Sequence, residues 1–292
     1  MSIFKAAITA AAPDQKQLPL QSLVDQLGET KTALQLIADE AITAGIEEIA
    51  LVICPGEQGN YEKAAGEHAF RFTFVPQDNP RGYGDALLRA REFVGDDRFL
   101  HLVSDHIYLS QHPRGYAGQL IDIAIVENCS VSTVQPIREN LLPFFGTAGA
   151  TRIANRRKLY EIKNVMEKPT PTQAEQSLIV AGLLTSHYLR LPGMHILTPT
   201  IMELLEREMK AAKAGSHIAL SPALEEPAKC ERYLATEVDG GRWRSMEVDG
   251  GRWRSIQHRR PIWSAQSSGR FGIIRKRPER NFGRTAWPRC RK

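Results

Sequence analysis

The sequence predicts an α/β fold, with a mostly parallel sheet and helices on both faces, followed by a basic tail that we expect to be disordered. Short apolar runs that suit buried strands alternate with longer stretches of helical periodicity, and this alternation gives a parallel sheet covered on both sides. With 42% hydrophobic and 24% charged residues among 292, the chain can bury a full core. We place the α/β domain at residues 1–238 and the tail at 239–292.

The expected elements follow one another along the first 136 residues. Each strand is a short run rich in branched or aromatic apolar residues, and each helix has apolar residues three or four positions apart. In chain order they are strand 5–9, helix 32–44, strand 48–53, helix 57–65, strand 71–75, helix 85–93, strand 99–103, helix 116–127 and strand 130–136. Further on, 160–165 reads as a strand, 177–191 is apolar and ambiguous, and 199–212 is an amphipathic helix.

Asp105 is the first candidate functional residue. It follows the apolar run 99–103, and ligands of open α/β sheets bind at the carboxyl ends of such strands. A carboxylate there can hold Mg²⁺ against phosphate oxygens, because this ion prefers hard oxygen ligands. The alternative is that Asp105 only caps the next turn, which is common for Asp at loop starts.

The segment before Asp105 suggests a site for a flat ligand. Gln77 offers an amide that both donates and accepts, which matches the edge of a pyrimidine ring. Gly82 and Gly84 let the backbone approach a ligand closely and open the helix expected at 85–93. The alternative is an ordinary Pro-Arg-Gly turn.

This order of Gln, Pro, Gly-x-Gly, strand and Asp resembles the sugar-1-phosphate nucleotidyltransferases, most closely the UTP-glucose-1-phosphate uridylyltransferase branch. The resemblance runs in order from about Lys5 to about Leu205. Its motifs are specific together, although each alone is weak. Further segments that agree with it are 6–12, 18–20, 28–31, 40–49, the Glu-Lys-Pro of 167–169, and 193–199.

The resemblance implies a Rossmann-like fold and a transferase that joins a sugar 1-phosphate, here glucose 1-phosphate, to a nucleoside triphosphate, here UTP, with Mg²⁺ as cofactor. Pyrophosphate is then the second product. The implied roles are Lys31, Lys16 and Asp105 in catalysis, with Asp105 on the metal; Ala11, Ala12, Gln77 and Gly82 on the nucleotide; and Gly146, Glu167 and Lys168 on the sugar phosphate. Without the resemblance, Lys31 reads as a solvated lysine and Glu167–Lys168 as a surface ion pair of little energetic value.

Two departures from the family pattern argue against catalytic activity. The glycine-rich first loop is replaced by Ala-Pro-Asp-Gln-Lys at 12–16, in which Pro13 lacks an N–H donor and Asp14 adds negative charge near the phosphates. Arg244 stands where the family places a second metal-binding Asp, and nothing in their spacing shows that Asp239 or Asp249 replaces it. The second hypothesis is therefore a catalytically weak or inactive relative that binds nucleotide or nucleotide sugar as a sensor or partner subunit.

The tail is set apart by charge and by an internal duplication. Residues 237–245 and 247–255 both read EVDGGRWRS. From Gly240 onward the net charge is +12, against −7 before it, and all four tryptophans lie there. One reading is a basic, aromatic arm that binds nucleic acid. The favoured one is a duplication followed by out-of-frame sequence, which attracts anions only non-specifically. We expect 256–292 in particular to be poorly ordered.

Partners and compartment follow from what the sequence lacks. No run approaches 18 apolar residues and the N-terminal apolar run is too short for a signal peptide, so we expect a cytoplasmic protein with no membrane partner. The four cysteines are scattered and read as free thiols. Self-association through a sheet edge or through the helix after Pro199 stays open, as do the preferred base and sugar.

Overall fold

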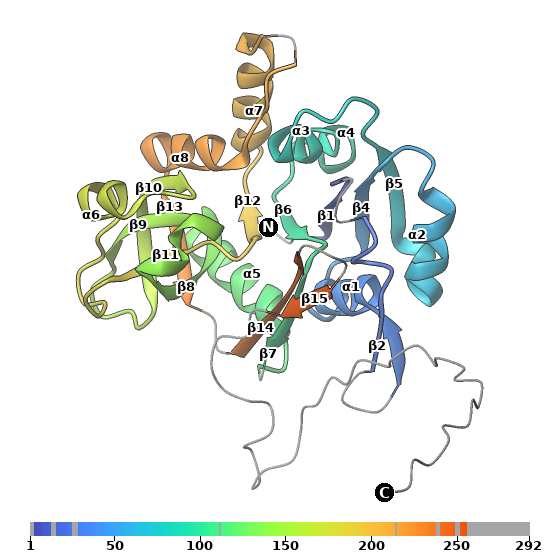
Figure 1. Ribbon diagram of the computed structural model, residues 1–292, viewed down its shortest axis with the longest axis horizontal. Helices are drawn as coiled ribbons and strands as arrows, with labels where there is room; N and C mark the ends of the chain where they lie inside the picture. The colour runs from blue at the N-terminus through green and yellow to red at the C-terminus, as the bar shows by residue number, and fades with distance from the viewer. Residues whose placement is uncertain are drawn as a thin grey trace, which may run out of the picture.

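A computed structural model describes residues 3–12, 16–24, 29–110, 112–213, 215–237, 240–248 and 252–255, with the backbone alone described at Leu109, 240–248 and 252–255. A ten-stranded sheet runs through the molecule with helices packed against it (Figure 1). The predicted α/β class is therefore confirmed.

The strands account for most of the framework of the site. They are β1 (Lys5–Ala10), β2 (Ser22–Val24), β3 (Thr30–Thr32), β4 (Glu48–Ile53), β5 (Phe72–Pro76), β6 (Phe99–Val103), β7 (His106–Ser110), β8 (Ser130–Arg138), β9 (Gly146–Arg152), β10 (Leu159–Glu167), β11 (His187–Arg190), β12 (Met194–Leu197), β13 (Tyr233–Glu237), β14 (Gly240–Val248) and β15 (Arg252–Ser255). The helices are α1 (Ala33–Thr43), α2 (Gln58–Ala65), α3 (Tyr83–Leu88), α4 (Arg91–Val94), α5 (Gly115–Glu127), α6 (Pro171–Ser177), α7 (Thr200–Ala211) and α8 (Leu220–Cys230), with 3₁₀ turns at Gly66–Arg71 and Glu139–Phe144.

The large sheet is parallel in one half and mixed in the other. Its order is β11-β9-β10-β13-β8-β12-β6-β1-β4-β5, and the four strands from β6 to β5 are parallel. Helices connect β1 to β4 and β4 to β5, as parallel neighbours require. Beyond β6 only β13 and β8 pair in parallel, whereas β12, β11, β9 and β10 pair antiparallel. The mostly parallel arrangement expected from the sequence thus holds for the N-terminal strands.

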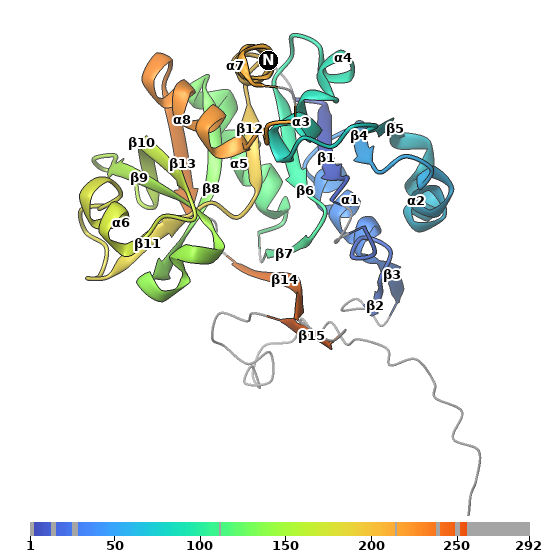
Figure 2. The same cartoon turned by 45° about the horizontal axis from the view of Figure 1, so that its top comes forward.

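Helices cover both faces of the sheet, as expected. Apolar side chains of α1, α2 and α5 share one core with one face of the strands. Those of α3, α4, α7 and α8 share a second core with the other face. Figure 2 shows the two groups of helices on either side of the central strands. Strands covered on both faces need apolar residues at successive positions, and 48–53 has five consecutive buried residues after Glu48.

The helix expected at 85–93 differs from the structure. It begins at Tyr83, because Gly82 at φ +110° serves as its N-cap and accepts from Ala86 N at 3.0 Å. It ends at Leu88, where Ala90 N bonds to Leu87 O at 3.0 Å and tightens the turn, and α4 follows separately. The earlier start places Tyr83 in the first turn of the helix, beside the candidate site.

The end of the described chain adds a small second sheet. β14 pairs antiparallel with β7, so that Gly240 lies opposite Ser110 and Arg244 opposite His106, and β15 folds back on β14. The predicted boundary at residue 238 falls just before this strand, and the division into two domains stays a prediction. The sequence predicts disorder for the tail 239–292 as a whole, whereas β14 and β15 are strands within it, since β14 pairs with β7. The rest of the tail, 256–292, lies outside the described residues.

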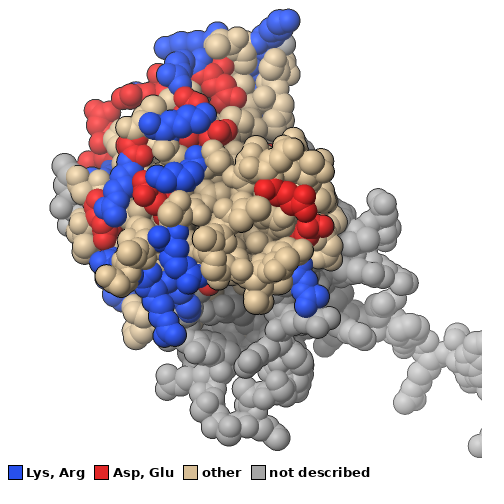
Figure 3. Space-filling model, turned by 90° about the vertical axis from the view of Figure 1, so that its left-hand side faces the viewer, with Lys and Arg blue, Asp and Glu red and all other residues tan. Residues whose placement is uncertain are grey.

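Among the described residues, no helix combines the length and the apolar character that crossing a membrane requires. Figure 3 shows acidic and basic side chains side by side over much of one face of the molecule. Exposed pairs such as Arg207–Glu226, at 3.5 Å, and Lys229–Glu226, at 3.1 Å, have this character. Charges arranged in this way neutralise one another locally, so this face does not act as a uniformly charged surface.

Candidate active site

A cavity of 580 Å³ opens where the parallel strands end. Its lining comes from residues after β1, β5 and β6, from the start of β9, the end of β10, β12, and helices α3 and α8. It brings together eight of the residues singled out from the sequence, which are Ala11, Ala12, Gln77, Gly82, Asp105, Gly146, Glu167 and Lys168. Residues separated by up to 157 positions therefore share one ligand-sized space.

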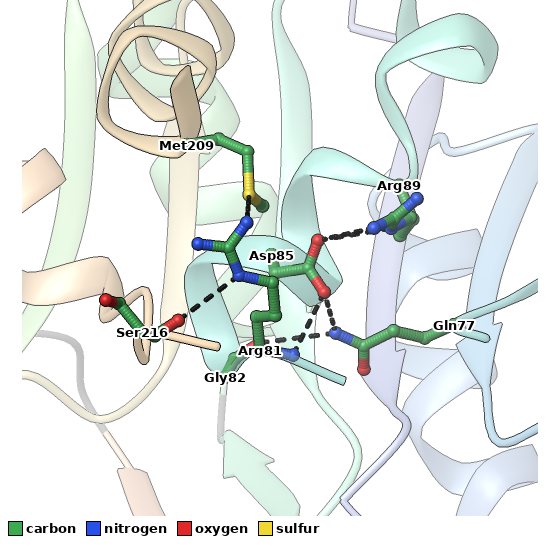
Figure 4. Close-up of polar contacts among 7 residues, drawn as sticks. All are labelled: Gln77, Arg81, Gly82, Asp85, Arg89, Met209 and Ser216. Atoms are coloured by element: carbon green, nitrogen blue, oxygen red, sulfur yellow. Dashed lines mark hydrogen bonds and ion pairs between the residues drawn. The ribbon is translucent and has the colours of Figure 1, made fainter. Parts of the chain in front are cut away.

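Gln77 is held in one orientation by Asp85 (Figure 4). The Gln77 amide nitrogen donates to Asp85 Oδ2 at 2.6 Å, and Asp85 is fully buried. Arg89 donates to the other carboxylate oxygen at 2.8 Å, which neutralises the buried charge. Because a carboxylate only accepts, the Gln77 oxygen must point away from Asp85, as Figure 4 shows. Gln77 lines the cavity, so that oxygen is its acceptor there.

Gly82 and Gly84 allow other parts of the chain to pack closely against them. A Cβ at Gly82 would lie 2.5 Å from His217 Nε2, and one at Gly84 would lie 2.9 Å from Ala219 O. Ile218 also joins this loop to the helix, since its N–H bonds to Arg81 O at 2.6 Å and its carbonyl accepts from Gly84 N at 2.9 Å. Gly82 remains in the cavity lining, whereas the side of Gly84 expected to face a ligand is filled by Ile218 and Ala219.

Arg81 adds to the same connection. Its guanidinium donates to Ser216 O at 3.2 Å and to Met209 Sδ at 2.8 Å (Figure 4). It also donates to Lys213 O at 3.1 Å. These contacts fix the segment before α8 against α3 and so close one wall of the cavity. The sequence gives no signal for them, because the partners are more than 120 residues apart.

Asp105 lies in the cavity lining directly after β6. Its carboxylate is hydrogen-bonded to Nδ1 of His106 and is 10% exposed. The strand pairing of β7 with β14 places the backbone of Arg244 opposite His106. The position at which the resemblance expects a second metal-binding Asp is thus next to Asp105 in space, while Asp239 and Asp249 lie outside the described residues.

Glu167 and Lys168 form the far wall of the cavity. Glu167 accepts from Ser221 Oγ of α8 at 2.6 Å, and Gly146 packs so closely that a Cβ there would lie 3.1 Å from the same carboxylate oxygen. Lys168 has φ +46° and its ammonium is 4.0 Å from Glu167 Oε1. With 60% of its side chain exposed, Lys168 is able to reach a ligand.

The first loop is described only at its two ends. Ala11 and Ala12 line the cavity, and Cys54 Sγ lies 3.3 Å from Ala11 O. The altered residues 13–15 of the expected phosphate loop lie outside the described residues. Tyr61 donates to both Ala10 O and Lys16 O at 3.1 Å and thereby holds the two ends together.

The two lysines expected in catalysis do not line the cavity. Lys16 lies 2.7 Å from Glu57, and this hydrogen bond and ion pair raise the pKa of Lys16. Lys31 lies 2.8 Å from Asp39, directly before the capping box that starts α1. The structure therefore groups the nucleotide, metal and sugar-phosphate candidates but leaves both lysines paired with carboxylates outside the group.

Several lining residues escaped the sequence analysis. Tyr83 lies over the sheet and donates to His101 Nε2 at 2.6 Å, because His101 Nδ1 must itself donate to Ala7 O at 3.0 Å. Burial lowers the pKa of His101 to about 4, so the ring is neutral. The other missed residues are His195, His217 and Ser221. Tyr83 and His195 lie within or beside the segments that resemble the nucleotidyltransferases, but the resemblance assigns neither residue a role.

The fold and the cavity define an α/β protein with a ligand-sized cavity at the carboxyl ends of its parallel strands, where open α/β sheets bind ligands. A family model described as nucleotidyl transferase matches residues 21–248. The chain belongs to the nucleotidyl transferase family.

Relatives and solved structures agree. The UTP–glucose-1-phosphate uridylyltransferase of Streptococcus pneumoniae serotype 4 is 28% identical over 266 residues, covering 82% of this chain and 84% of that protein. A UTP–glucose-1-phosphate uridylyltransferase 1 of Streptococcus pyogenes serotype M3 is 27% identical and covers 82% and 83%. A UDP-glucose pyrophosphorylase complexed with UDP-glucose superposes with a TM-score of 0.65 at 25% identity, covering 82% of this chain and 92% of that one. For the UTP-bound enzyme of Acinetobacter baumannii, which is 20% identical and covers 83% and 88%, the TM-score of 0.63 shows a shared fold.

Proposed function

We propose that this protein transfers a uridylyl group from UTP to glucose 1-phosphate, giving UDP-glucose and pyrophosphate. The observation that carries the proposal is a single cavity with a base-reading acceptor, Gln77, at one side and the pair Glu167–Lys168 at the other. A ligand that joins a base to a sugar through phosphates has groups for both of these sets of residues. Relatives named as UTP–glucose-1-phosphate uridylyltransferases and a related structure containing UDP-glucose support the same substrates.

The orientation of Gln77 favours uracil over cytosine. Uracil carries a hydrogen on N3, which needs an acceptor, whereas N3 of cytosine is itself an acceptor. Since Asp85 fixes the Gln77 amide nitrogen, the oxygen presented to the cavity complements uracil. Thymine has the same ring edge, so discrimination between the two depends on the space around the methyl group.

Glu167 and Lys168 suit the sugar phosphate. The Glu167 carboxylate accepts hydrogen bonds from hydroxyl groups, as it does from Ser221. The Lys168 ammonium supplies positive charge for the phosphate without a fixed geometry. The exposed fraction of Lys168 makes its existing ion pair with Glu167 weak, so exchanging Glu167 for a phosphate costs little.

A magnesium ion fits the site only when the substrate supplies most of its ligands. Among the described residues no group of three or more His, Cys, Asp or Glu side chains is arranged around a common point. Mg²⁺ is commonly held by one or two carboxylates together with phosphate oxygens and water, and Asp105 provides one carboxylate. When bound there, the ion would neutralise charge on the phosphate oxygens.

The chemistry is an in-line displacement in which an oxygen of the sugar phosphate forms a bond to the α-phosphorus and the bond to pyrophosphate breaks. The residues of this chain act by positioning and by charge. Gln77 and Gly82 orient the base, and Lys168 and Glu167 orient the attacking phosphate. Lys16 and Lys31 contribute to the phosphates only if they leave Glu57 and Asp39.

Pyrophosphate release from UTP and glucose 1-phosphate with Mg²⁺, measured beside calorimetric binding of UTP, tests the proposal. Turnover that depends on both substrates supports it. Binding without turnover supports instead the inactive relative, a sensor or partner subunit, for which the position of Arg244 opposite His106 is the specific argument. An Arg244→Asp variant then shows whether a carboxylate at that position restores metal-dependent turnover.

A further inference from the structure

A chain of buried hydrogen bonds ends at His195, which lines the cavity. His195 Nδ1 lies 2.5 Å from Ser132 Oγ, which lies 2.5 Å from the hydroxyl oxygen of Tyr233. The three residues come from β12, β8 and β13, which are neighbours in the sheet. Their exposed fractions are 2%, 0% and 1%, so their hydrogen-bonding groups must be satisfied within the protein or by a ligand.

Only one direction of donation gives each buried hydrogen a partner. Among the described residues Ser132 Oγ is the partner of the Tyr233 hydroxyl, so Tyr233 donates to Ser132. Ser132 then uses its own hydrogen to donate to His195 Nδ1. An imidazole that accepts at Nδ1 and is neutral carries its proton on Nε2. Burial, followed by the neighbouring His101, holds the pKa of His195 well below its ordinary value and keeps the ring neutral.

The Nε2–H group of His195 opens onto the cavity. No described residue is its hydrogen-bond partner, and Nε2 is not among the described side-chain atoms that are both fully enclosed and unpartnered. His195 Nε2 is therefore accessible, and His195 lines the cavity. The ring is held in place by His101, which stacks on it with centroids 5.9 Å apart and planes 11° from parallel.

We propose that His195 Nε2–H donates a hydrogen bond to an oxygen of the nucleotide or nucleotide sugar bound in the cavity, and that Tyr233 and Ser132 fix it in this tautomer. The assignment rests on the proposed function for the identity of the ligand. His195 belongs to β12, which lies between β6, with Asp105 at its end, and the strands that carry Glu167. Its donor thus lies between the two ends of the cavity, where phosphate and hydroxyl oxygens of such a ligand pass.

Two substitutions of His195 distinguish its contact with a ligand, through Nε2, from its buried contact with Ser132, through Nδ1. In His195→Asn the short amide can stay bonded to Ser132 but does not reach the position of Nε2. In His195→Gln the longer amide places an N–H near that position. We expect His195→Asn to weaken binding of UDP-glucose about tenfold by calorimetry, the loss of one hydrogen bond, and His195→Gln to recover most of it. Thr133→Val is the matched control, because it removes a buried 3.1 Å bond to Met194 O on the same pair of strands. It should lower stability and leave UDP-glucose affinity unchanged.

The tautomer is read independently on the wild-type protein. Nitrogen and carbon NMR shifts of the His195 ring should show Nε2–H in the free protein, and that proton should move when UDP-glucose is added. An Nδ1–H tautomer overturns the assignment. So does an affinity for UDP-glucose that is the same in the wild type and in both His195 variants, or one that falls equally in both variants. Failure of wild-type protein to bind UDP or UDP-glucose overturns the proposed function as well. A loss in His195→Asn that is the same with UDP places the acceptor on the nucleotide, and one confined to UDP-glucose places it on the glucosyl group.

Discussion

His101 and His195 lie directly opposite each other on β6 and β12, with their rings stacked at 5.9 Å in the buried centre of the sheet. Burial lowers the pKa of His101 to about 4, and burial together with His101 keeps the pKa of His195 well below its ordinary value. Both rings are therefore neutral in the folded protein at pH 7. Protonating either would place a charge beside its neighbour at a site where burial leaves the charged ring poorly hydrated.

Stability should consequently fall in mild acid. Unfolded histidine titrates near pH 6.5, so between about pH 6.5 and 4 the unfolded chain binds protons that the folded chain does not. The contribution of the two buried histidines to the unfolding free energy is fully present above pH 6.5. Below pH 6.5 it decreases by about 1.4 kcal/mol per pH unit for each histidine. Urea unfolding from pH 7.5 to 4.5 measures this slope. His101→Phe should remove the share of the slope that comes from one histidine. A flat profile would contradict the assignment of two neutral histidines.

Asp105→Asn should abolish metal-dependent turnover while the protein remains folded. The substitution removes the carboxylate proposed to hold Mg²⁺ and weakens its hydrogen bond to His106, which costs about 1 kcal/mol of unfolding free energy. Pyrophosphate release across a magnesium titration and a thermal unfolding curve check the two parts. Asp97→Asn, which changes a carboxylate that is 73% exposed near Lys5, is the control. Full activity of Asp105→Asn would exclude it as the metal ligand.

Lys168→Met should raise the KM for glucose 1-phosphate and lower kcat/KM about a hundredfold or more, corresponding to about 3 kcal/mol of charge-assisted bonding. The KM for UTP should change much less. Lys163→Met provides the comparison, because Lys163 lies on β10, which ends just before Lys168, but pairs with Glu161 outside the cavity lining. Equal losses for both substrates would indicate that Lys168 acts through the structure of the site.

Asp85→Asn should weaken the preference for UTP over CTP. With an amide in place of the carboxylate, the Gln77 side chain can turn and present its N–H₂ to the base, which suits cytosine N3. Competition between the two nucleotides in the binding assay measures the change. Because Arg89 also loses its partner, a loss of about 1–3 kcal/mol of unfolding free energy should accompany it. An unchanged preference would show that Gln77 does not read the base.

A chain that ends at Glu237 should fold, because the ten-stranded sheet is complete at β13 and, among the described strands, β14 pairs only with β7 and β15. Thermal unfolding should remain cooperative and close to that of the whole protein. A chain that ends at Cys230 lacks β13, which lies between β10 and β8 inside the sheet, and should not fold. If removing 238–292 unfolds the protein, the tail contributes to the core.

The sequence predicted the elements with strong local patterns and missed those defined by distant contacts. Strands 48–53 and 99–103 match β4 and β6 because their apolar runs are bounded by polar residues. Strands β9 and β11 have no such pattern, since their neighbours in the sheet decide their pairing.

The same limit applies to the site. Asp105 and Gln77 could be found from their place after a strand, and both line the cavity. The positions of Lys16 and Lys31 depend on Glu57 and Asp39, which pair with them across the fold. The Nε2–H tautomer of His195 depends on Tyr233 and Ser132, two residues on other strands, and therefore has no local signature at all.

The exact duplication gives β7 two identical partners. The residues now opposite it, 240–244, recur unchanged as 250–254, so the energy of pairing cannot distinguish the copies. Only the length of the connection from Glu237 does, because the first copy leaves a loop of two residues and the second a loop of twelve. Loop-closure entropy favours the first by about 1.5 kcal/mol. The sequence therefore allows either copy to pair with β7, and the length of the connecting loop decides which one does. Deleting either copy would leave an Arg opposite His106.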